Sequence, residues 1–477
     1  MAVQDLVVLG GGTAGLTAAV GAAGQGARTL LVERDRTGGD CLWTGCVPSK
    51  ALLTVAERAQ QARTGAELGV EVGEVRVDFA AAMAHVRASI ATIAPHDSAE
   101  RLGREGVEVV SGTGRFTGPD RIEVGGRTVR FRHAMIATGA DPVLPPIPGL
   151  EEAQPLTSDT LWDLTGLPGR LVVLGGGPIG VELGQAFARL GSRVTVVEMA
   201  PQLLPREEPR AAEVVTSSLR ADGIEVRTSA RAVRVEPDAR AHRLVVDEDG
   251  HEQTVGFDRL LVAVGRRPSL DGLGLREARV RVTSRGAVEV DERLRTSNPR
   301  IYAGGDATML LPFTHTAGAH GATVVQNAVF GLRRRVDHER IPWVTFTDPE
   351  VARVGLSVAE ARERFGDEVR VRTAEHASLD RAVTAARTEG FVTLVGSPRG
   401  RLVGATVVGP RAGETIGEVV AWMAAKASLS SIVRTTHAYP TWNQDLADAS
   451  LEELRVSLGR ARSASRALLA ARRTLLR

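Results

Sequence analysis

The two cysteines of this 477-residue chain, Cys41 and Cys46, lie five positions apart. In a regular helix this spacing corresponds to about 7.5 Å of rise and about 140° of rotation, which is beyond the reach of a disulfide bond. If the two thiols pair, the backbone between them must be irregular, and Gly39 and Gly45 supply the freedom it needs. Two buried, inert thiols are the alternative interpretation.

A glycine motif precedes the cysteines and favours the redox-active interpretation. Gly10, Gly12 and Gly15 follow an apolar run at residues 7–9, and Glu33 ends the next apolar run. This pattern predicts a strand, a glycine turn, a helix and a second strand. The glycines allow the backbone to approach a pyrophosphate at the helix N-terminus, and the acid accepts a hydrogen bond from a ribose hydroxyl.

The chain repeats this motif with Gly175, Gly177 and Gly180, and Glu198 ends the following apolar run. One copy is weak support for nucleotide binding, but two copies in the same context predict two bound dinucleotides. A carboxylate at position 198 accepts the ribose hydroxyls of NADH and repels the extra phosphate of NADPH, so we expect NADH. Arg206 and Arg210 follow closely in the sequence. They either bind that phosphate or are solvent-exposed residues at the start of a helix.

On these motifs the chain resembles the class I pyridine nucleotide-disulfide oxidoreductases, which include dihydrolipoamide dehydrogenase, glutathione reductase and mercuric reductase. Further matches lie at residues 136–139, 262–268 and 301–306. The resemblance implies an α/β fold with two Rossmann-like dinucleotide-binding domains, the second inserted in the first, and a C-terminal α+β dimerisation domain. It places FAD-binding residues in 1–150 and 271–344, NAD(P)-binding residues in 151–270, the dimerisation domain in 345–450 and a basic tail in 451–477.

The resemblance also implies the cofactors and the residues that hold them. FAD and NAD(H) are expected, with NADP(H) disfavoured, and no resident metal is predicted. A helix start near residue 314 should present backbone amides to the flavin, and His315 is interpreted as a structural hydrogen-bonding group. The cofactor-binding residues implied are Gly10, Gly12, Gly15, Glu33, Gly39, Lys50, Gly114, Thr138, Gly139, Gly175, Gly177, Gly180, Glu198, Gly265, Asp306, Phe313, Thr314 and His315.

By resemblance, NADH reduces the flavin and the flavin reduces a Cys41–Cys46 disulfide, with Cys46 beside the flavin and Cys41 facing outward. Lys50 follows Cys46 by one helical turn and is one of only two lysines among 59 basic residues. An ammonium is a compact point charge, whereas a guanidinium is a bulky planar group, so we expect this position to require a lysine specifically. The resemblance places it near the flavin, paired with Glu182.

The chain departs from dihydrolipoamide dehydrogenase at its substrate end. Tyr439 and Gln444 stand where that enzyme carries the His and Glu that exchange a proton with a dithiol. A phenol with a pKa near 10 is a poor base, so efficient oxidation of dihydrolipoamide is not expected. His437 is the alternative base, because residues two apart in an extended segment share a face.

Two further departures bear on the electron acceptor. Mercuric reductases also carry Tyr at the position of Tyr439, but they use a further C-terminal cysteine pair, and this chain has no cysteine after Cys46. Trp43 replaces the usual Asn between the two cysteines. Its indole either shields the disulfide, offers a surface on which a flat acceptor could stack, or packs in the core.

Composition narrows the class of protein. The net charge of +2 does not favour a nucleic-acid partner, and no apolar run is long enough to span a membrane. The first strand begins near residue 3, which leaves no room for a signal peptide, so we expect a cytoplasmic protein. The resemblance implies a homodimer in which each active site borrows residues 437–444 from the partner subunit. Residues 454–477 hold seven arginines and no acid. We interpret them as a solubilising tail, with a basic amphipathic helix on a membrane surface as the alternative.

The sequence therefore predicts an FAD-dependent NADH oxidoreductase with a redox-active disulfide. Its acceptor is predicted to be a quinone, a metal ion or a small disulfide. Dihydrolipoyl dehydrogenase or mercuric reductase activity is the first alternative. A non-catalytic FAD- and NAD-binding redox sensor is the second, although such a protein would have no need to keep Cys41, Cys46, Lys50 and Glu182 together.

Overall fold

The computed structural model describes residues 3–238 and 242–475. The chain separates into two compact units. The first comprises Met1–Leu203 and Asp222–His338, and the second comprises Leu204–Ala221 and Glu339–Arg477. Among the described residues, no helix is long and apolar enough to cross a membrane.

The first unit is built on a sheet with the order β3-β2-β1-β6-β5-β4, and β16 adds to it beside β6. The strands β3, β2, β1, β6 and β16 pair with one another in parallel, whereas β5 is antiparallel to both β4 and β6. Their apolar residues are buried, as expected for a parallel sheet covered on both faces. The bounds are β1 Gln4–Leu9, β2 Thr29–Glu33, β3 Val107–Ser111, β4 Arg115–Gly118, β5 Arg121–Val124, β6 Arg127–Ile136 and β16 Ile301–Ala303.

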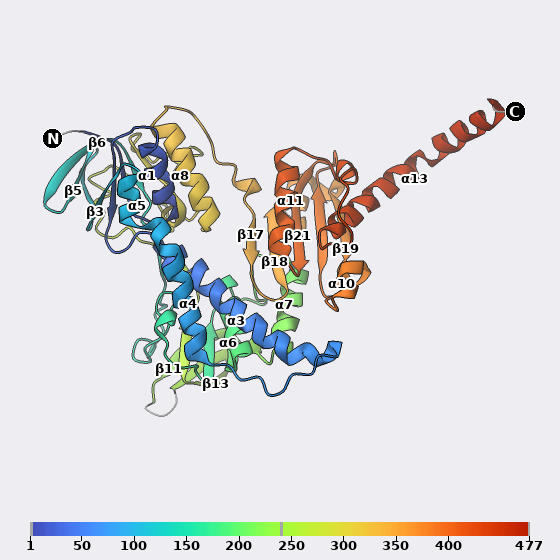
Figure 1. The fold of residues 1–477 in the computed structure, drawn as a ribbon, viewed down its shortest axis with the longest axis horizontal. Coiled ribbons are helices and arrows are strands. Elements are labelled where there is room, and N and C mark those ends of the chain that lie inside the picture. The colour runs from blue at the N-terminus through green and yellow to red at the C-terminus, as the bar shows by residue number, and fades with distance from the viewer. Residues whose placement is uncertain (1–2, 239–241, 476–477) are drawn as a thin grey trace. The chain divides into compact units, whose positions relative to one another are not determined.

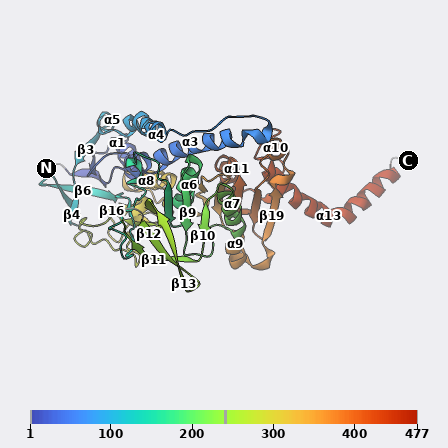
Figure 2. The ribbon, with the colours of Figure 1, turned by 90° about the horizontal axis from the view of Figure 1, so that it is seen from below.

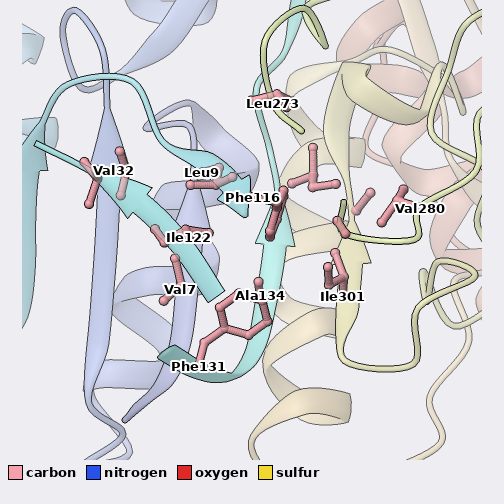
Figure 3. Packing of buried hydrophobic residues seen from close by; sticks show 14 of the residues in the cluster. Val7, Leu9, Val32, Phe116, Ile122, Phe131, Ala134, Leu273, Val280 and Ile301 are labelled. Carbon is pink, nitrogen blue, oxygen red and sulfur yellow. The ribbon is translucent and has the colours of Figure 1, made fainter. Parts of the chain in front are cut away.

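One face of this sheet is covered by α1 (Thr13–Ala23) and α8 (Thr314–Ala328), which lie side by side (Figure 1). Gly321 permits their close approach, because a Cβ there would lie 2.5 Å from the carbonyl oxygen of Ala14. The other face packs on a separate apolar cluster, in which the rings of Phe116 and Phe131 meet edge to face at 6.0 Å (Figure 3). The sheet is thus held between two cores, and the ends of its strands have fixed positions.

A second parallel sheet, of order β10-β9-β8-β14, lies between β6 and β16 in the sequence. Its strands are β8 Arg170–Leu174, β9 Arg193–Val197, β10 Glu225–Arg227 and β14 Arg259–Val262, with α6 Pro178–Leu190 following β8. An antiparallel sheet accompanies it, formed by β11 Ala230–Glu236, β12 His242–Glu248 and β13 His251–Phe257. The connections before and after this insertion pair as β7 Ala140–Pro142 and β15 Arg266–Pro268. The chain therefore leaves the first sheet, completes a second dinucleotide-binding unit and returns.

The remaining helices of the first unit carry the cysteine segment and its neighbours. The short α2 (Gly39–Trp43) is followed by the long α3 (Cys46–Thr64), which lies against α4 (Phe79–Ile93) and α6. After α4 come a single 3₁₀ turn, Ala94–Asp97, and α5 (Ala99–Arg104). Asp78 and Ser98 cap α4 and α5, since each side chain accepts a hydrogen bond from a first-turn amide.

The second unit contains a five-stranded antiparallel sheet of order β17-β18-β21-β20-β19. Residues of β20 are buried along its whole length, as suits an inner strand. The bounds are β17 Trp343–Thr345, β18 Glu350–Gly355, β19 Arg370–Glu375, β20 Phe391–Gly396, β21 Leu402–Gly409, α7 Pro209–Ala221, α9 Val358–Phe365, α10 Asp380–Thr384, α11 Ala412–Ala424, α12 Leu429–Ile432 and α13 Gln444–Leu475. These elements match the α/β fold and C-terminal α+β domain expected from the sequence.

The last helix, α13, begins inside the second unit and then leaves it (Figures 1 and 2). Near its start, the buried Asp445 carboxylate lies 3.1 Å from His376 Nε2, in the turn after β19, and Glu453 pairs with the half-buried Arg370 of β19 at 2.6 Å. From Arg455 onward its described side chains are exposed. The basic tail is therefore helical in this structure as far as Leu475, and its predicted role as a solubilising or membrane-binding segment stays a prediction.

Candidate active site

The backbone between the two cysteines is irregular, as a disulfide bond between them would require. α2 ends at Trp43 and α3 begins at Cys46, and Gly45 between them has φ −114° and ψ −109°. A Cβ at Gly45 would lie 2.9 Å from the carbonyl oxygen of Asp40, so the sharp turn leaves little room for a larger residue. No bond joins Cys41 and Cys46 in this structure.

The surroundings of the two thiols separate their acidities. The hydrogen bond from the Cys41 thiol, with further help from the Thr314 hydroxyl and the Lys50 ammonium, lowers the pKa of Cys46 to about 6 against the opposing effect of burial. The Thr314 hydroxyl lies 3.3 Å from the Cys46 sulfur. The same hydrogen bond and burial raise the pKa of Cys41. The thiolate therefore resides on Cys46 and the proton on Cys41.

Lys50 and Glu182 form the pair that the resemblance implied. Lys50 Nζ lies 2.7 Å from Glu182 Oε2; the lysine side chain is 37% exposed and the glutamate 8%. Lys50 projects from α3 one turn after Cys46, and Glu182 projects from α6 of the inserted domain. The nearly buried carboxylate fixes the ammonium beside the Cys46 thiolate.

The first glycine motif contains two glycines that the protein needs for its own packing and one that it does not. A Cβ at Gly10 would lie 2.2 Å from the carbonyl oxygen of Ala137, and one at Gly15 would lie 1.9 Å from that of Gly10. A Cβ at Gly12 would meet its nearest neighbour, a Cα atom, only at 3.8 Å. The space over Gly12 therefore suits a ligand that approaches the backbone, as a dinucleotide pyrophosphate does.

The second glycine motif repeats this geometry. A Cβ at Gly175 or Gly180 would lie 2.5 Å or 2.0 Å from a carbonyl oxygen, whereas a Cβ at Gly177 would meet nothing within 4 Å. The two acids also correspond, since Glu33 Oε2 accepts from the Gly11 amide at 2.6 Å and Glu198 Oε2 accepts from the Gly176 amide at 2.7 Å. Both motifs thus fit a dinucleotide on the protein's own geometry.

Other predicted cofactor residues fall into two groups. In the first group, packing within the protein itself requires glycine. A Cβ at Gly39 would lie 2.7 Å from Gly12 Cα, and a Cβ at Gly114 would lie 2.6 Å from a Leu9 methyl group. The second group leaves polar atoms or space for a ligand. The Thr138 hydroxyl is buried and has no hydrogen-bond partner among the described residues, and Gly139 and Gly265 have positive φ values with open space above them.

The start of α8 and the adjoining acid complete the predicted FAD-binding residues. α8 begins at Thr314 with Phe313 as its N-cap, and no side chain caps it. The rings of Phe313 and His315 stack at 5.5 Å with an interplanar angle of 4°. Burial raises the pKa of Asp306, which lies in the 3₁₀ turn preceding α8. The structure thus brings Cys41, Cys46, Lys50, Glu182 and this helix start together.

Sequence reasoning overlooked a pair directly behind the cysteines. Arg266, the first residue of β15, donates to the Asp40 carboxylate and the Ala140 carbonyl, and it donates to the Ser158 hydroxyl at 3.1 Å. Burial raises the pKa of Asp40 to about 6, although Arg266 opposes this shift. The sequence does show an acid, Asp40, directly before Cys41. Its partner Arg266 could not be identified, because it lies far away in the sequence.

Trp43 is held locally. Its Nε1 donates to the Thr37 carbonyl at 2.8 Å, and the Arg36 guanidinium lies over the ring at 4.2 Å. This cation–π contact covers one face of the indole. A flat acceptor therefore could not stack on that face without displacing Arg36.

A pocket of about 430 Å³ lies beside Cys46, between α3 and α4. The residues that line it are Cys46, Val47, Lys50, Ala51, Thr54, His85, Ser89 and Ile93. His85 and Ser89 were not found by sequence reasoning, because no local motif marks a helix face that packing brings next to a distant cysteine. The pocket gives a small molecule or ion access to the Cys46 sulfur.

The C-terminal segment lies in the second unit, where each predicted residue has a different partner. Tyr439 is 72% exposed, and its hydroxyl donates to Asp380 at 2.5 Å. This hydrogen bond raises the pKa of the phenol. The His437 side chain is 3% exposed and bonds through Nε2 to Glu418 at 2.9 Å. Gln444 is the first residue of α13. These three residues do not form one cluster within the subunit.

The comparisons with known proteins agree with this geometry. Residues 4–321 match the family described as pyridine nucleotide-disulphide oxidoreductase, and residues 341–450 match its dimerisation domain. A mercuric reductase of Streptomyces lividans is 38% identical over 93% of this chain and 94% of its own. A dihydrolipoyl dehydrogenase of Thermus scotoductus is 36% identical over 94% of this chain and 97% of its own.

Among solved structures, the Cu(II) complex of the HOCl-induced flavoprotein disulfide reductase RclA from Escherichia coli is similar to this chain. Its TM-score is 0.83 at 28% sequence identity, and the match covers 94% of this chain and 99% of that one.

Proposed function

The chain belongs to the pyridine nucleotide-disulphide oxidoreductase family, and on that premise we propose that it transfers electrons from NADH, through bound FAD and the Cys41–Cys46 pair, to a thiophilic metal ion. The observation that carries this proposal is the position of the Cys46 sulfur, which lies 3.3 Å from the Thr314 hydroxyl and lines an open pocket. A thiolate on Cys46 beside an open pocket can bind a soft metal ion directly.

Two sets of residues would hold the cofactors. Gly10, Gly12, Gly15 and Glu33 would bind the adenosine pyrophosphate of FAD, with Asp306 and the start of α8 around the rest of the molecule. When bound, FAD would accept a hydride from NADH and pass the two electrons on. Gly175, Gly177, Gly180 and Glu198 would bind NADH, and Lys50 with Glu182 would keep one positive charge beside Cys46.

Glu198 is the reason for choosing NADH over NADPH. Both of its carboxylate oxygens already accept backbone amides, from Gly176 and Ala200, so its position is fixed. Arg210, the candidate for binding a 2′-phosphate, is paired with Glu375 at 2.5 Å and lies over the Phe391 ring at 4.1 Å. These contacts favour the acid as the specificity determinant.

The reduction and re-formation of the Cys41–Cys46 disulfide balance in protons and electrons. Two electrons and one proton break the Cys41–Cys46 bond and leave a thiol on Cys41 and a thiolate on Cys46. One Hg²⁺, or two Cu²⁺ ions in turn, would take the two electrons and give Hg⁰ or two Cu⁺. The disulfide then re-forms as Cys41 releases its proton to solvent. The overall balance is NADH plus 2 Cu²⁺ giving NAD⁺, 2 Cu⁺ and H⁺.

A metal ion suits this chain better than a dithiol because it requires no general base. Tyr439 donates to Asp380 and has a raised pKa, and His437 is buried against Glu418. The mercuric reductase relative and the Cu(II) complex of the similar reductase support the same class of acceptor. The lack of a C-terminal cysteine pair distinguishes the chain from mercuric reductases that use one, so the ion would have to be bound by the Cys41–Cys46 pair itself.

Dihydrolipoyl dehydrogenase activity is the second candidate, because relatives with that activity cover nearly the whole chain. A quinone, a small disulfide and a non-catalytic sensor role are the remaining alternatives. We further propose a homodimer, which the match to the dimerisation domain supports, and in it residues 437–444 would serve the partner subunit's active site, as the resemblance implies. A reducing cytoplasm is the proposed location, because the single cysteine pair is assigned a catalytic role.

The test is an acceptor panel under anaerobic conditions with NADH as donor. Cu²⁺, Hg²⁺, a soluble quinone, glutathione disulfide and lipoamide are compared by NADH consumption, and Cu⁺ is trapped by a colorimetric chelator. We expect turnover with Cu²⁺ or Hg²⁺ that Cys46→Ser abolishes. Turnover with quinone alone, unchanged in Cys46→Ser, would overturn the assignment of a metal ion, and no turnover with any acceptor would favour the sensor.

A further inference from the structure

Residues 433–443 form the loop between α12 and α13. One carboxylate, that of Glu418, contacts this loop at two residues, His437 and Asn443. Glu418 Oε1 lies 2.9 Å from His437 Nε2, and Glu418 Oε2 accepts a hydrogen bond from Asn443 Nδ2 at 2.8 Å. Tyr439 lies between these two contacts in the sequence. A loop that is fixed at two points loses much of the conformational freedom it would otherwise have.

The carboxylate itself is mounted on a rigid element. Glu418 belongs to α11, whose Ile416, Val419 and Met423 are buried in the core of the second unit. Trp422, one turn later on the same helix, meets the His437 ring edge-on at 6.1 Å. The imidazole is thus enclosed between a carboxylate and an indole, which explains why its side chain is only 3% exposed.

Tyr439 has the opposite environment. It is 72% exposed, which is unusual for an aromatic side chain on a fixed loop, and its hydroxyl is oriented by Asp380 at the start of α10. Inside the loop the Thr441 hydroxyl donates to the Ala438 carbonyl at 2.7 Å, which closes the turn after Tyr439. The contacts therefore anchor His437 and Asn443 and leave Tyr439, between them, exposed.

We propose that Glu418 is a positioning residue that holds residues 437–443 so that Tyr439 is presented to the electron acceptor. This inference rests on the proposed function, because it takes the acceptor to be bound near residues 437–444 of the partner subunit. Glu418 and His437 act through Tyr439 and do not touch the acceptor. The competing possibility is a displaced His–Glu acid–base pair.

Two substitutions of Glu418 separate these possibilities. Glu418→Ala removes both contacts. Glu418→Gln keeps an oxygen for the Asn443 amide and offers an amide that neutral His437 can accept in its other tautomer, so the loop stays held while the charge is lost. If Glu418 only positions the loop, we expect the Glu418→Gln variant to keep the activity with the electron acceptor and the Glu418→Ala variant to lose it. An acid–base pair predicts that both variants lose function, because an amide cannot stabilise an imidazolium.

Glu414 provides the matched control. It is an exposed acid one turn earlier on α11, so Glu414→Ala changes the same charge on the same helix without touching the loop. We expect Glu418→Ala to raise the KM for the acceptor at least about tenfold, a change of roughly 1.4 kcal/mol. The rate at which NADH reduces the protein should be unchanged, and Glu414→Ala and Glu418→Gln should resemble the natural protein.

A double-mutant cycle with Tyr439→Ala then tests whether Glu418 acts through Tyr439. Positioning predicts that Glu418→Ala adds no further loss when Tyr439 is already absent. Additive losses, or an equal loss in Glu418→Gln with a shifted pH profile, would overturn the proposal. The cycle uses whichever acceptor of the panel turns over, so a wrong choice of metal ion leaves its result interpretable.

Amide hydrogen exchange supplies a readout that does not depend on activity. Glu418→Ala should speed exchange in residues 433–443 while the strands of the second unit keep their protection, and Glu414→Ala should leave both unchanged. Unaltered exchange in the loop of Glu418→Ala would refute the holding role even if the proposed electron acceptor is correct. Faster exchange with no metal reduction by the natural protein would instead refute the proposed function alone.

Discussion

The Cys46 sulfur lies 3.3 Å from the Thr314 hydroxyl, although the two residues are 268 positions apart. Cys46 starts α3 and Thr314 starts α8, so this contact joins the starts of two helices at one site. The positive ends of helix dipoles and a hydroxyl donor both favour an anion. The first unit thereby builds a thiolate site from two segments that its parallel sheet brings together.

Removing this hydroxyl should raise the pKa of Cys46. In Thr314→Val we expect the pH midpoint of Cys46 alkylation, measured on the reduced protein with iodoacetamide, to move upward from about 6. At pH 7 the variant should consequently react more slowly, because less of its thiol is ionised. Thr314→Ser retains the donor and should keep the midpoint of the natural protein. A Thr314→Val profile identical to that of the natural protein would show that Cys41 and Lys50 suffice.

The redox-active pair should be visible in an anaerobic titration of the FAD-loaded protein. Full reduction should consume about two equivalents of NADH per subunit, one for FAD and one for the disulfide. Long-wavelength absorbance should develop while the Cys46 thiolate lies against oxidised FAD, and Cys46→Ser should abolish it. Uptake of a single equivalent by fully oxidised protein would contradict a redox-active disulfide.

The two kinds of glycine in the second motif should respond differently to alanine. Gly180→Ala places a Cβ 2.0 Å from a carbonyl oxygen, so it should lower the thermal unfolding temperature. Gly177→Ala meets nothing in the protein and should unfold at the temperature of the natural protein, yet it should weaken NADH binding measured by calorimetry. If Gly177→Ala binds NADH normally, the nucleotide does not approach the backbone there.

Glu198 should determine the choice of nicotinamide. The ratio of kcat/KM for NADH to that for NADPH should be at least about ten, or roughly 1.4 kcal/mol, and Glu198→Ala should reduce it. Arg210→Ala is the control, because its guanidinium is already paired with Glu375. Equal use of both nucleotides by the natural protein would mean that a basic residue outweighs the acid.

The missing base should limit dithiol chemistry alone. We expect dihydrolipoamide oxidation to be slow near pH 7 and to rise with pH as the substrate thiols ionise, since loss of a general base costs about 10² to 10⁴ in rate. Tyr439→His combined with Gln444→Glu should raise this activity and leave reduction of a quinone or metal ion nearly unchanged. Fast oxidation by the natural protein that is lost in His437→Ala but kept in Tyr439→Phe would instead make His437 the base.

Much of the first unit could be read from the sequence because its motifs are local. The turn from strand to helix at Gly10 and Gly175 needs glycines at fixed spacing, and both acids follow at the end of the next strand. Lys50 could be placed near Cys46 because one helical turn separates them. The irregular backbone between the cysteines followed from helix geometry alone.

Contacts between distant segments required the tertiary structure. Thr314 beside Cys46, Arg266 on Asp40 and His85 in the Cys46 pocket are set by how sheets and helices pack, and no local pattern marks such partners. The same applies to Glu418, whose hold on His437 turned a candidate base into an anchored side chain. The sequence by itself thus determined the class of chemistry, since that depends on residue types at short spacing. The tertiary structure decided which groups surround the Cys46 sulfur and which aromatic side chain is exposed, since these depend on neighbours that only folding supplies.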